Sequence, residues 1–267
     1  MAEQEQQHAN ADEEWDWENS KLSKVKQAFK EEFIARIALD KGHRLMDIGC
    51  AEGEFLDQLS SQVHSIVGID IDAGEIKKAN EKNTCPNIIY KVADFGTDLG
   101  DCSKEWQNNF DTIMSGFTLH FIEDQPKALK NMYDCLKPGG KLHLTYIGDK
   151  RGWTTKAEAY VRNHPKWGPL VKDAKGKNII IESTADKVKG MIESVGFQDV
   201  QVYQDHDLAE DDYDDDDASG YIYGVLNLSF SIPDAVCKEY MADVSKFSRD
   251  NFGTNSPWEY VEIVCKK

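Results

Sequence analysis

The sequence is poor in positive charge. Its 267 residues carry 31 Lys and Arg against 48 Asp and Glu, which gives a formal net charge of −17 at pH 7. A field of that sign repels phosphate backbones and anionic lipid headgroups. We therefore expect neither nucleic acid nor a membrane surface among the partners of this protein.

Paired cysteines and long apolar runs are also missing. The six cysteines are scattered, and no CxxC pair or His/Cys cluster indicates zinc, so we expect reduced thiols and no metal. No apolar stretch approaches the roughly 20 residues that cross a bilayer. The polar N-terminus lacks the basic and apolar regions of a signal peptide. These absences favour a cytoplasmic protein and leave its oligomeric state open.

The apolar periodicity indicates an α/β fold. Short apolar strands alternate with amphipathic helices, which predicts a mostly parallel sheet with helices on both faces. Residues 1–14 are polar and acidic and are expected to be disordered, so that residues 15–267 form the domain. Within it, residues 148–182 and 205–257 interrupt the alternation, and we expect them to contribute a small helical cap at the acceptor site.

A glycine turn, DIGCAEG at residues 47–53, follows the first expected strand. Gly49 allows a tight backbone turn, and Gly53 allows the next helix to approach a ligand. The G-x-A-x-G spacing is wrong for a dinucleotide, and the acidic neighbours Asp47 and Glu52 disfavour a pyrophosphate. They favour a cofactor that carries an ammonium and a sulfonium, and the alternative is a purely structural strand-to-helix turn.

Two carboxylates stand at the ends of the next two expected strands. Asp70 comes 21 residues after Gly49, the spacing at which a carboxylate meets a ribose diol, while Asp72 is expected to cap the following helix. Asp94 can accept a hydrogen bond from an adenine amino group, and Phe95 offers apolar cover and a backbone N–H. The carboxyl ends of parallel strands meet at one edge, so we expect these groups to form one pocket.

The order of the motifs resembles that of the class I S-adenosylmethionine-dependent methyltransferases. The matching segments are DIGCAEG, GIDID, VADF, FDTIMSGFTLHF, LKPGGKLHLTY and MIESVGFQDV, and the resemblance covers most of residues 21–267. It implies a Rossmann-like seven-stranded sheet with a reversed last strand, with S-adenosyl-L-methionine as cofactor and S-adenosyl-L-homocysteine as product. The implied cofactor contacts are Gly49, Cys50, Ala51, Gly53, Asp70, Ile71, Asp94, Phe95 and the backbone near Ser115.

Other features resemble the juvenile hormone acid O-methyltransferases, which act on carboxyl groups of small molecules. Shared features include an N-terminal helix preceded by aromatics and the segment Leu119-His120-Phe121. The resemblance implies O-methylation by proximity and orientation, because a carboxylate needs no general base. Family members place a glutamine near the start of the N-terminal helix, where this chain has Leu22 or Ser23. A small-molecule amine N-methyltransferase and a non-catalytic methyltransferase-like binding protein are the alternatives.

One histidine and several aromatic residues are the candidates for the acceptor site. His120 is expected to orient the acceptor or to act as a general base, with an ordinary lid or core histidine as the alternative. Aromatic walls suit an apolar or cationic acceptor. The candidate acceptor residues are Trp15, Trp17, Phe117, His120, Phe121 and Trp153. The acidic run from Asp211 to Asp217 is expected to be a solvated loop.

Overall fold

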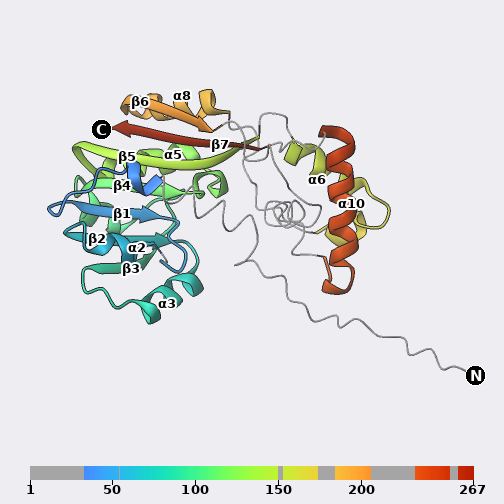
Figure 1. Ribbon diagram of the computed structural model, residues 1–267, viewed down its shortest axis with the longest axis horizontal. Helices are drawn as coiled ribbons and strands as arrows, with labels where there is room; N and C mark the ends of the chain where they lie inside the picture. Colours follow the sequence, from blue (N-terminus) through green and yellow to red (C-terminus); the bar gives the residue numbers. More distant parts are fainter. Residues whose placement is uncertain (1–32, 54, 150–152, 174–183, 206–231, 253–257) are drawn as a thin grey trace, which may run out of the picture. The chain divides into compact units, whose positions relative to one another are not determined.

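The computed structural model of the chain (Figure 1) describes residues 33–53, 55–149, 153–173, 184–205, 232–252 and 258–267. Its contacts divide the chain into two compact units, Met1–Arg36 and Ile37–Lys267. The elements described below all belong to the second unit.

A seven-stranded sheet organises the second unit, with the strand order β3-β2-β1-β4-β5-β7-β6. Strand β7 runs antiparallel to both of its neighbours, and the other neighbouring pairs are parallel. The prediction of a Rossmann-like sheet with a reversed last strand is confirmed. The strands are β1 (Arg44–Ile48), β2 (Ser65–Asp70), β3 (Ile88–Val92), β4 (Phe110–Gly116), β5 (Leu136–Asp149), β6 (Gln198–Asp205) and β7 (Trp258–Lys266).

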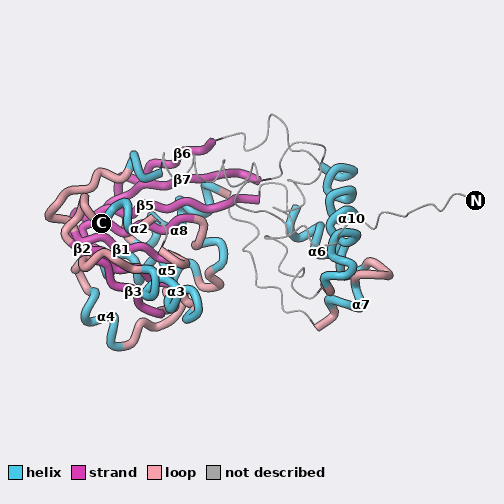
Figure 2. The backbone as a smooth tube through the Cα atoms, turned by 60° about the horizontal axis from the view of Figure 1, so that its bottom comes forward, coloured by secondary structure: helices cyan, strands magenta, loops and turns pink. Residues whose placement is uncertain are grey.

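Helices connect successive strands (Figure 2). Helix α4, only six residues long, is an addition to the elements that the periodicity indicated, whereas α6 and α7 lie in the range 148–182 that was expected to contribute a helical cap. The helices are α2 (Leu56–Ser60), α3 (Ala73–Lys82), α4 (Asp101–Trp106), α5 (Gln125–Cys135), α6 (Trp153–Asn163), α7 (Gly168–Val171), α8 (Ala185–Val195) and α10 (Asp234–Phe252), with a 3₁₀ turn, η1, at Leu119–Phe121.

Short polar side chains fix where the helices begin. Asp72 accepts hydrogen bonds from the backbone N–H groups of Gly74 and Glu75, so its predicted capping of α3 is confirmed. Thr184 caps α8 through the N–H of Lys187. Gly196 ends α8 in the left-handed conformation at φ 114°, which glycine adopts without strain.

The order of the strands places the ligand-binding edge. Strand β1 lies between β2 and β4, so the chain proceeds outward from β1 to β3 and then returns to the other side of β1. Ligands of open α/β sheets bind at such a reversal, outside the carboxyl ends of the strands. The turns that follow β1, β2 and β4 therefore define the expected site.

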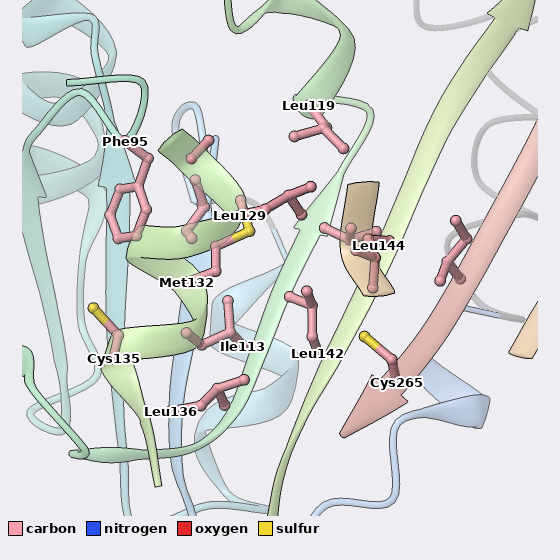
Figure 3. Close-up of a cluster of buried hydrophobic side chains, with 14 of the residues drawn as sticks. Phe95, Ile113, Leu119, Leu129, Met132, Cys135, Leu136, Leu142, Leu144 and Cys265 are labelled. Carbon is pink, nitrogen blue, oxygen red and sulfur yellow. The ribbon is translucent and has the colours of Figure 1, made fainter. Parts of the chain in front are cut away.

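The main hydrophobic core lies between the sheet and helices α5 and α8. Figure 3 shows Ile113 and Leu142 from the sheet pointing toward Leu129 and Met132 of α5. These four side chains are fully buried, and burying such a side chain stabilises the fold by about 1.5–3 kcal/mol. This packing holds the strands in place, so the strand ends that carry the site have a rigid base.

A second hydrophobic cluster joins helices α6, α7 and α10, which fall within the residue ranges expected to form the cap. Trp167 is fully buried in this cluster, and its indole N–H donates to Asp243 Oδ2 at 2.9 Å. The ring of Tyr240 packs edge-on against Trp167 with centroids 5.4 Å apart. The segments 153–173 and 232–252, far apart in sequence, thus share one small core of their own.

Candidate functional site

The turn after β1 has the sharp geometry that its glycines predict. Gly49, Ala51 and Gly53 have φ values of 81°, 47° and 77°, all in the left-handed region. The backbone N–H groups of Gly49 and Cys50 both donate to the carbonyl of Ile69 in β2, at 2.7 and 3.0 Å. Alanine in the left-handed region costs roughly 1–2 kcal/mol, so the turn holds strain at Ala51, which is exposed.

Asp70, the last residue of β2, is held against this turn. Its Oδ2 accepts the N–H of Ala51 at 3.0 Å, and its Oδ1 accepts the N–H of Asp72 at 2.9 Å. Each carboxylate oxygen has a further lone pair, so the carboxylate retains capacity for two hydroxyl donors. The structure brings the predicted carboxylate and the predicted turn together, and the two backbone donors fix the carboxylate in position.

Tyr90 of β3 supports the turn from the sheet, and the sequence did not single it out. A methyl group added at Gly53 would lie 2.3 Å from Tyr90 Oη, and one at Gly68 would lie 2.7 Å from its Cδ1. The tyrosine is 6% exposed. The ring of Tyr90 therefore requires glycine at both positions. The alternating pattern of β3, IIYKV, was the signal in the sequence that Tyr90 points inward.

Two carboxylates give this turn a negative electrostatic environment. Burial raises the pKa of the Cys50 thiol well above its usual value, and the nearby carboxylates of Asp47 and Asp70 raise it further. The thiol of Cys50 therefore stays protonated and is a poor nucleophile. The same negative field favours a cation placed over the turn.

Glu52, the other acidic residue of the turn, is paired with two lysines. Its carboxylate pairs with Lys78 at 3.0 Å and also with Lys82, both on α3. These two ammonium groups hold the pKa of Glu52 below its usual value. The two lysines compensate the charge of Glu52 and tie α3 to the turn, and a role of Glu52 toward a cationic cofactor stays a prediction.

Asp94 and Phe95, which were predicted to act together, have different surroundings in the loop after β3. The Oδ1 of Asp94 accepts the N–H of Gly96 at 2.8 Å, and Asp94 is partly exposed. Phe95 is 2% exposed and stacks on Trp106 with centroids 6.0 Å apart. The side chain of Phe95 therefore belongs to the core and gives an adenine no apolar cover. Its backbone N–H remains a predicted contact.

Ile71, beside Asp70, is 66% exposed and can provide the apolar surface instead.

The exit of β4 is a second strained turn. Ser115 is buried, and its hydroxyl donates to the carbonyl of Ile48 at 2.9 Å, which joins β4 to the end of β1. Phe117 follows at φ 54°, a rare conformation for a bulky residue. Its N–H donates to the carbonyl oxygen of Thr145 at 2.9 Å. Such outliers persist where the surrounding structure imposes them, and they concentrate at functional sites.

His120 lies in η1 and is 3% exposed, so its imidazole is shielded from solvent in this structure. Burial lowers its pKa to about 3, which keeps the imidazole neutral. A base of that pKa is a weak proton acceptor at neutral pH, so the burial of His120 disfavours the general-base role, and the orienting role stays a prediction. The ring of His120 lies 4.3 Å from that of Phe121, which is 48% exposed.

The remaining predicted acceptor residues are placed only in part. Trp153 is the first residue of α6. Trp15, Trp17 and the acidic run of Asp211 to Asp217 lie outside the described residues. Among the residues that the structure describes, no group of three or more His, Cys, Asp or Glu is arranged to hold a metal ion. None of the described helices has both the length and the apolarity to cross a bilayer.

These features fit a nucleoside that carries a cationic tail. The turn presents backbone at the carboxyl edge of the sheet, Asp70 has lone pairs for a diol, and exposed Ile71 lies beside it. Side chains at Gly49 or Gly53 would collide with Thr118 or Tyr90, so the backbone surface of the turn depends on glycine. The carboxylate of Asp47, 7% exposed beside the turn, suits a positive charge.

The known proteins to which this chain is similar include several methyltransferases. The profile of the methyltransferase domain family matches residues 22–202. Juvenile hormone acid O-methyltransferase of Bombyx mori is 27% identical over 207 residues, which cover 76% of this chain and 72% of that protein. Phosphoethanolamine N-methyltransferase 1 of Triticum aestivum is 27% identical over 176 residues, which cover 61% of this chain but only 34% of that protein.

Solved structures support the fold. Phosphoethanolamine N-methyltransferase 2 of Haemonchus contortus, in complex with phosphomonomethylethanolamine and S-adenosylhomocysteine, has a TM-score of 0.56 at 16% identity. The match covers 91% of this chain and 53% of that one. Identity this low carries the arrangement of the sheet and helices, and the residues of the site have to be argued from this chain.

Proposed function

The chain belongs to the methyltransferase domain family and is an S-adenosylmethionine-dependent enzyme; from this premise we propose that its acceptor is a small-molecule carboxylic acid. The reaction would be O-methylation by proximity and orientation. The relative from Bombyx mori is named for an acid O-methyltransferase activity, and its match covers most of both chains.

The state of His120 is the observation that carries this proposal. The histidine of the predicted acceptor loop is buried, and its pKa is lowered to about 3. Amine and phenol acceptors ordinarily need a base to take their proton, whereas a carboxylic acid with a pKa of about 4 is already ionised at neutral pH. A loop whose histidine is an ineffective base suits an acceptor that needs none.

The residues of the chain would bind and orient the reactants. When bound, S-adenosylmethionine supplies a methyl group already activated on a sulfonium. Asp70 would hold the ribose hydroxyls, Asp94 the adenine amino group, and the turn at Gly49 the methionine end. Asp47 would favour the positive charge of that end. Alignment of this kind can supply roughly 7–11 kcal/mol of the barrier.

The bond changes need no proton transfer from the protein. The acceptor carboxylate oxygen forms a bond to the methyl carbon while the carbon–sulfur bond breaks, and sulfur keeps the electron pair. The products are a neutral ester and the neutral thioether S-adenosylhomocysteine. The exposed side chain of Phe121 offers apolar contact for the body of the acceptor.

Amine N-methylation is the second candidate. It is favoured by the net charge of −17, which attracts cationic acceptors, and by the match to the wheat phosphoethanolamine N-methyltransferase. An amine would be methylated in its neutral form, so its rate should rise with pH.

A panel of acceptors separates the two candidates. The full chain is incubated with S-adenosylmethionine and either apolar carboxylic acids or primary amines, including phosphoethanolamine, and release of S-adenosylhomocysteine is measured from pH 6 to about pH 9. We expect turnover with acids at a rate that is flat over this range. Turnover confined to amines, with a rate that climbs with pH, would reject the carboxylic-acid proposal.

A further inference from the structure

Thr118 joins the turn after β1 to the acceptor loop, defined here as Phe117–Phe121. A methyl group added at Gly49 would lie 1.9 Å from Thr118 Oγ1, 2.5 Å from its Cγ2 and 2.6 Å from its Cβ. Three atoms of one side chain therefore stand directly over the Gly49 backbone. We propose that Thr118 is a positioning residue through which cofactor binding at the turn orders the acceptor loop, an inference that rests on the proposed cofactor site.

Both of the segments in contact are strained. Ala51 and Phe117 are non-glycine residues with φ values of 47° and 54°. Each lies within two residues of the contact between Gly49 and Thr118. Strained backbone of this kind persists only while the surrounding contacts impose it, so a shift in one turn changes the contacts that hold the other.

Thr118 is held on its acceptor-loop side as well. Its hydroxyl donates to the carbonyl of Gly116 at 3.0 Å, and the N–H of Phe121 donates to the carbonyl of Thr118 at 2.9 Å. Movement of Thr118 is therefore transmitted to Phe121. The side chain of Phe121 is 48% exposed and was predicted to contact the acceptor.

The core fixes the middle of the acceptor loop. Leu119 is 1% exposed, and its carbonyl accepts the side-chain amide of Gln125, which is itself buried. With Leu119 anchored, the glycine turn can influence Phe117 and Thr118 directly, and Phe121 through its backbone bond to Thr118. A ligand that contacts Gly49 would restrict that part through Thr118.

Linkage gives the proposal a measurable consequence. If cofactor binding orders the loop, then weakening the contact lowers cofactor affinity by the same coupling free energy, which for coupled sites is typically 5- to 150-fold. The variant Thr118→Ala removes Oγ1 and Cγ2 but retains Cβ. We expect it to weaken binding of S-adenosylhomocysteine at the low end of this range, about 5-fold. Thr118→Val keeps the shape and should bind within about 2-fold of wild type.

The experiment combines hydrogen exchange with calorimetry on the full chain. Amide exchange of peptides that cover residues 116–122 is measured with and without S-adenosylhomocysteine. In wild type and Thr118→Val the ligand should slow this exchange, and in Thr118→Ala most of the slowing should be lost. Ser194→Ala is the matched control, because it removes a similar side-chain bond to a backbone carbonyl, that of Met191 in α8.

A mutant cycle tests the contact itself. Gly49→Ala should weaken ligand binding, partly through left-handed strain and partly through collision with Thr118. In a Thr118→Gly background the collision is absent, so the loss caused by Gly49→Ala should be smaller there. Equal losses in both backgrounds would overturn the contact as the means of coupling.

The outcomes separate this inference from the proposed function. A wild-type chain that fails to bind S-adenosylhomocysteine overturns the cofactor site and the inference together. Binding that is unchanged in Thr118→Ala, with full protection of residues 116–122, overturns the positioning role and leaves the proposed function standing. Tighter binding by Thr118→Ala would show that Thr118 obstructs the site. If Thr118→Ala does not fold, Thr118→Ser, which loses only Cγ2, is expected to lose protection partially.

Discussion

Removal of the Asp70 carboxylate is the most direct test of the cofactor site. In the structure its two oxygens accept the N–H groups of Ala51 and Asp72, at 3.0 and 2.9 Å. Those bonds aim the carboxylate at the turn and leave lone pairs for both ribose hydroxyls. The variants Asp70→Ala and Asp70→Asn differ in what remains, because asparagine keeps one carbonyl acceptor and loses the charge.

The magnitude follows from the bonds that are lost. Each hydrogen bond to a charged acceptor contributes about 1.5–3 kcal/mol, so two ribose bonds amount to about 3–6 kcal/mol. At about 1.4 kcal/mol for each factor of ten, Asp70→Ala should weaken binding of S-adenosylhomocysteine by roughly 100- to 10,000-fold. Asp70→Asn keeps one acceptor, so it should weaken binding by only about 10- to 100-fold, the loss expected for one bond.

Isothermal titration calorimetry measures the affinities, and thermal unfolding checks the fold. The bonds to Ala51 and Asp72 are exposed to solvent, so they contribute less than buried charged bonds, and their loss should lower the free energy of unfolding by about 1–2 kcal/mol, or roughly 2–8 °C in Tm. Asp40→Ala is the control, because Asp40 accepts the N–H of Gly42 at 2.8 Å before β1, at the opposite end of that strand. The control should bind normally.

Unchanged affinity in a folded Asp70→Ala variant would refute the assignment of Asp70. A loss of affinity equal in Asp40→Ala would show that general destabilisation, rather than contact with the ribose, explains the result. A loss confined to the Asp70 variants would agree with the reasoning.

Three further predictions follow from the same region. Ala51→Gly should raise the free energy of unfolding by up to about 1 kcal/mol in urea denaturation, because relief of left-handed strain exceeds the added entropy of the unfolded chain; a decrease would contradict the strain argument. Glu52→Gln should leave the affinity for S-adenosylmethionine unchanged while lowering Tm in low salt more than in high salt, since its carboxylate pairs with two lysines of α3; a marked loss of affinity would restore its predicted cofactor role. Burial lowers the pKa values of His120 and His143 to about 3 and about 4, below the ordinary 6.5, so the unfolded chain binds more protons below that pH. The free energy of unfolding should therefore fall from about pH 6.5 to about pH 4, by at most about 1.4 kcal/mol per pH unit for each histidine, and His120→Gln should flatten the dependence; an unchanged slope in that variant would reject the burial argument.

The parts of the site that were predictable depend on short stretches of chain. The strand β1, the left-handed turn and the capping of α3 by Asp72 follow from local apolar patterns and from residues that favour particular turns. The meeting of Asp70 with the turn follows from the rule that carboxyl ends of parallel strands share one edge. A helix as short as α4 shows too few apolar repeats for such patterns to be read.

Other features required partners that the local sequence does not identify. Phe95 stacks on Trp106 in the core, and Tyr90 packs on Gly53 from another strand. A motif places a residue on a loop but does not determine whether its side chain turns toward the ligand or toward the core. Helix packing at that position decides between these directions.

The amino-acid order by itself determined the class of fold, the sharp turn and the carboxylate at the end of β2, because each depends on hydrophobic period, backbone freedom or strand connection. Only the tertiary structure decided that Glu52 is neutralised by lysines, that His120 is buried and neutral, and that Thr118 rests on Gly49. The reason is that solvation, charge compensation and steric contact depend on groups that folding brings together from distant parts of the chain.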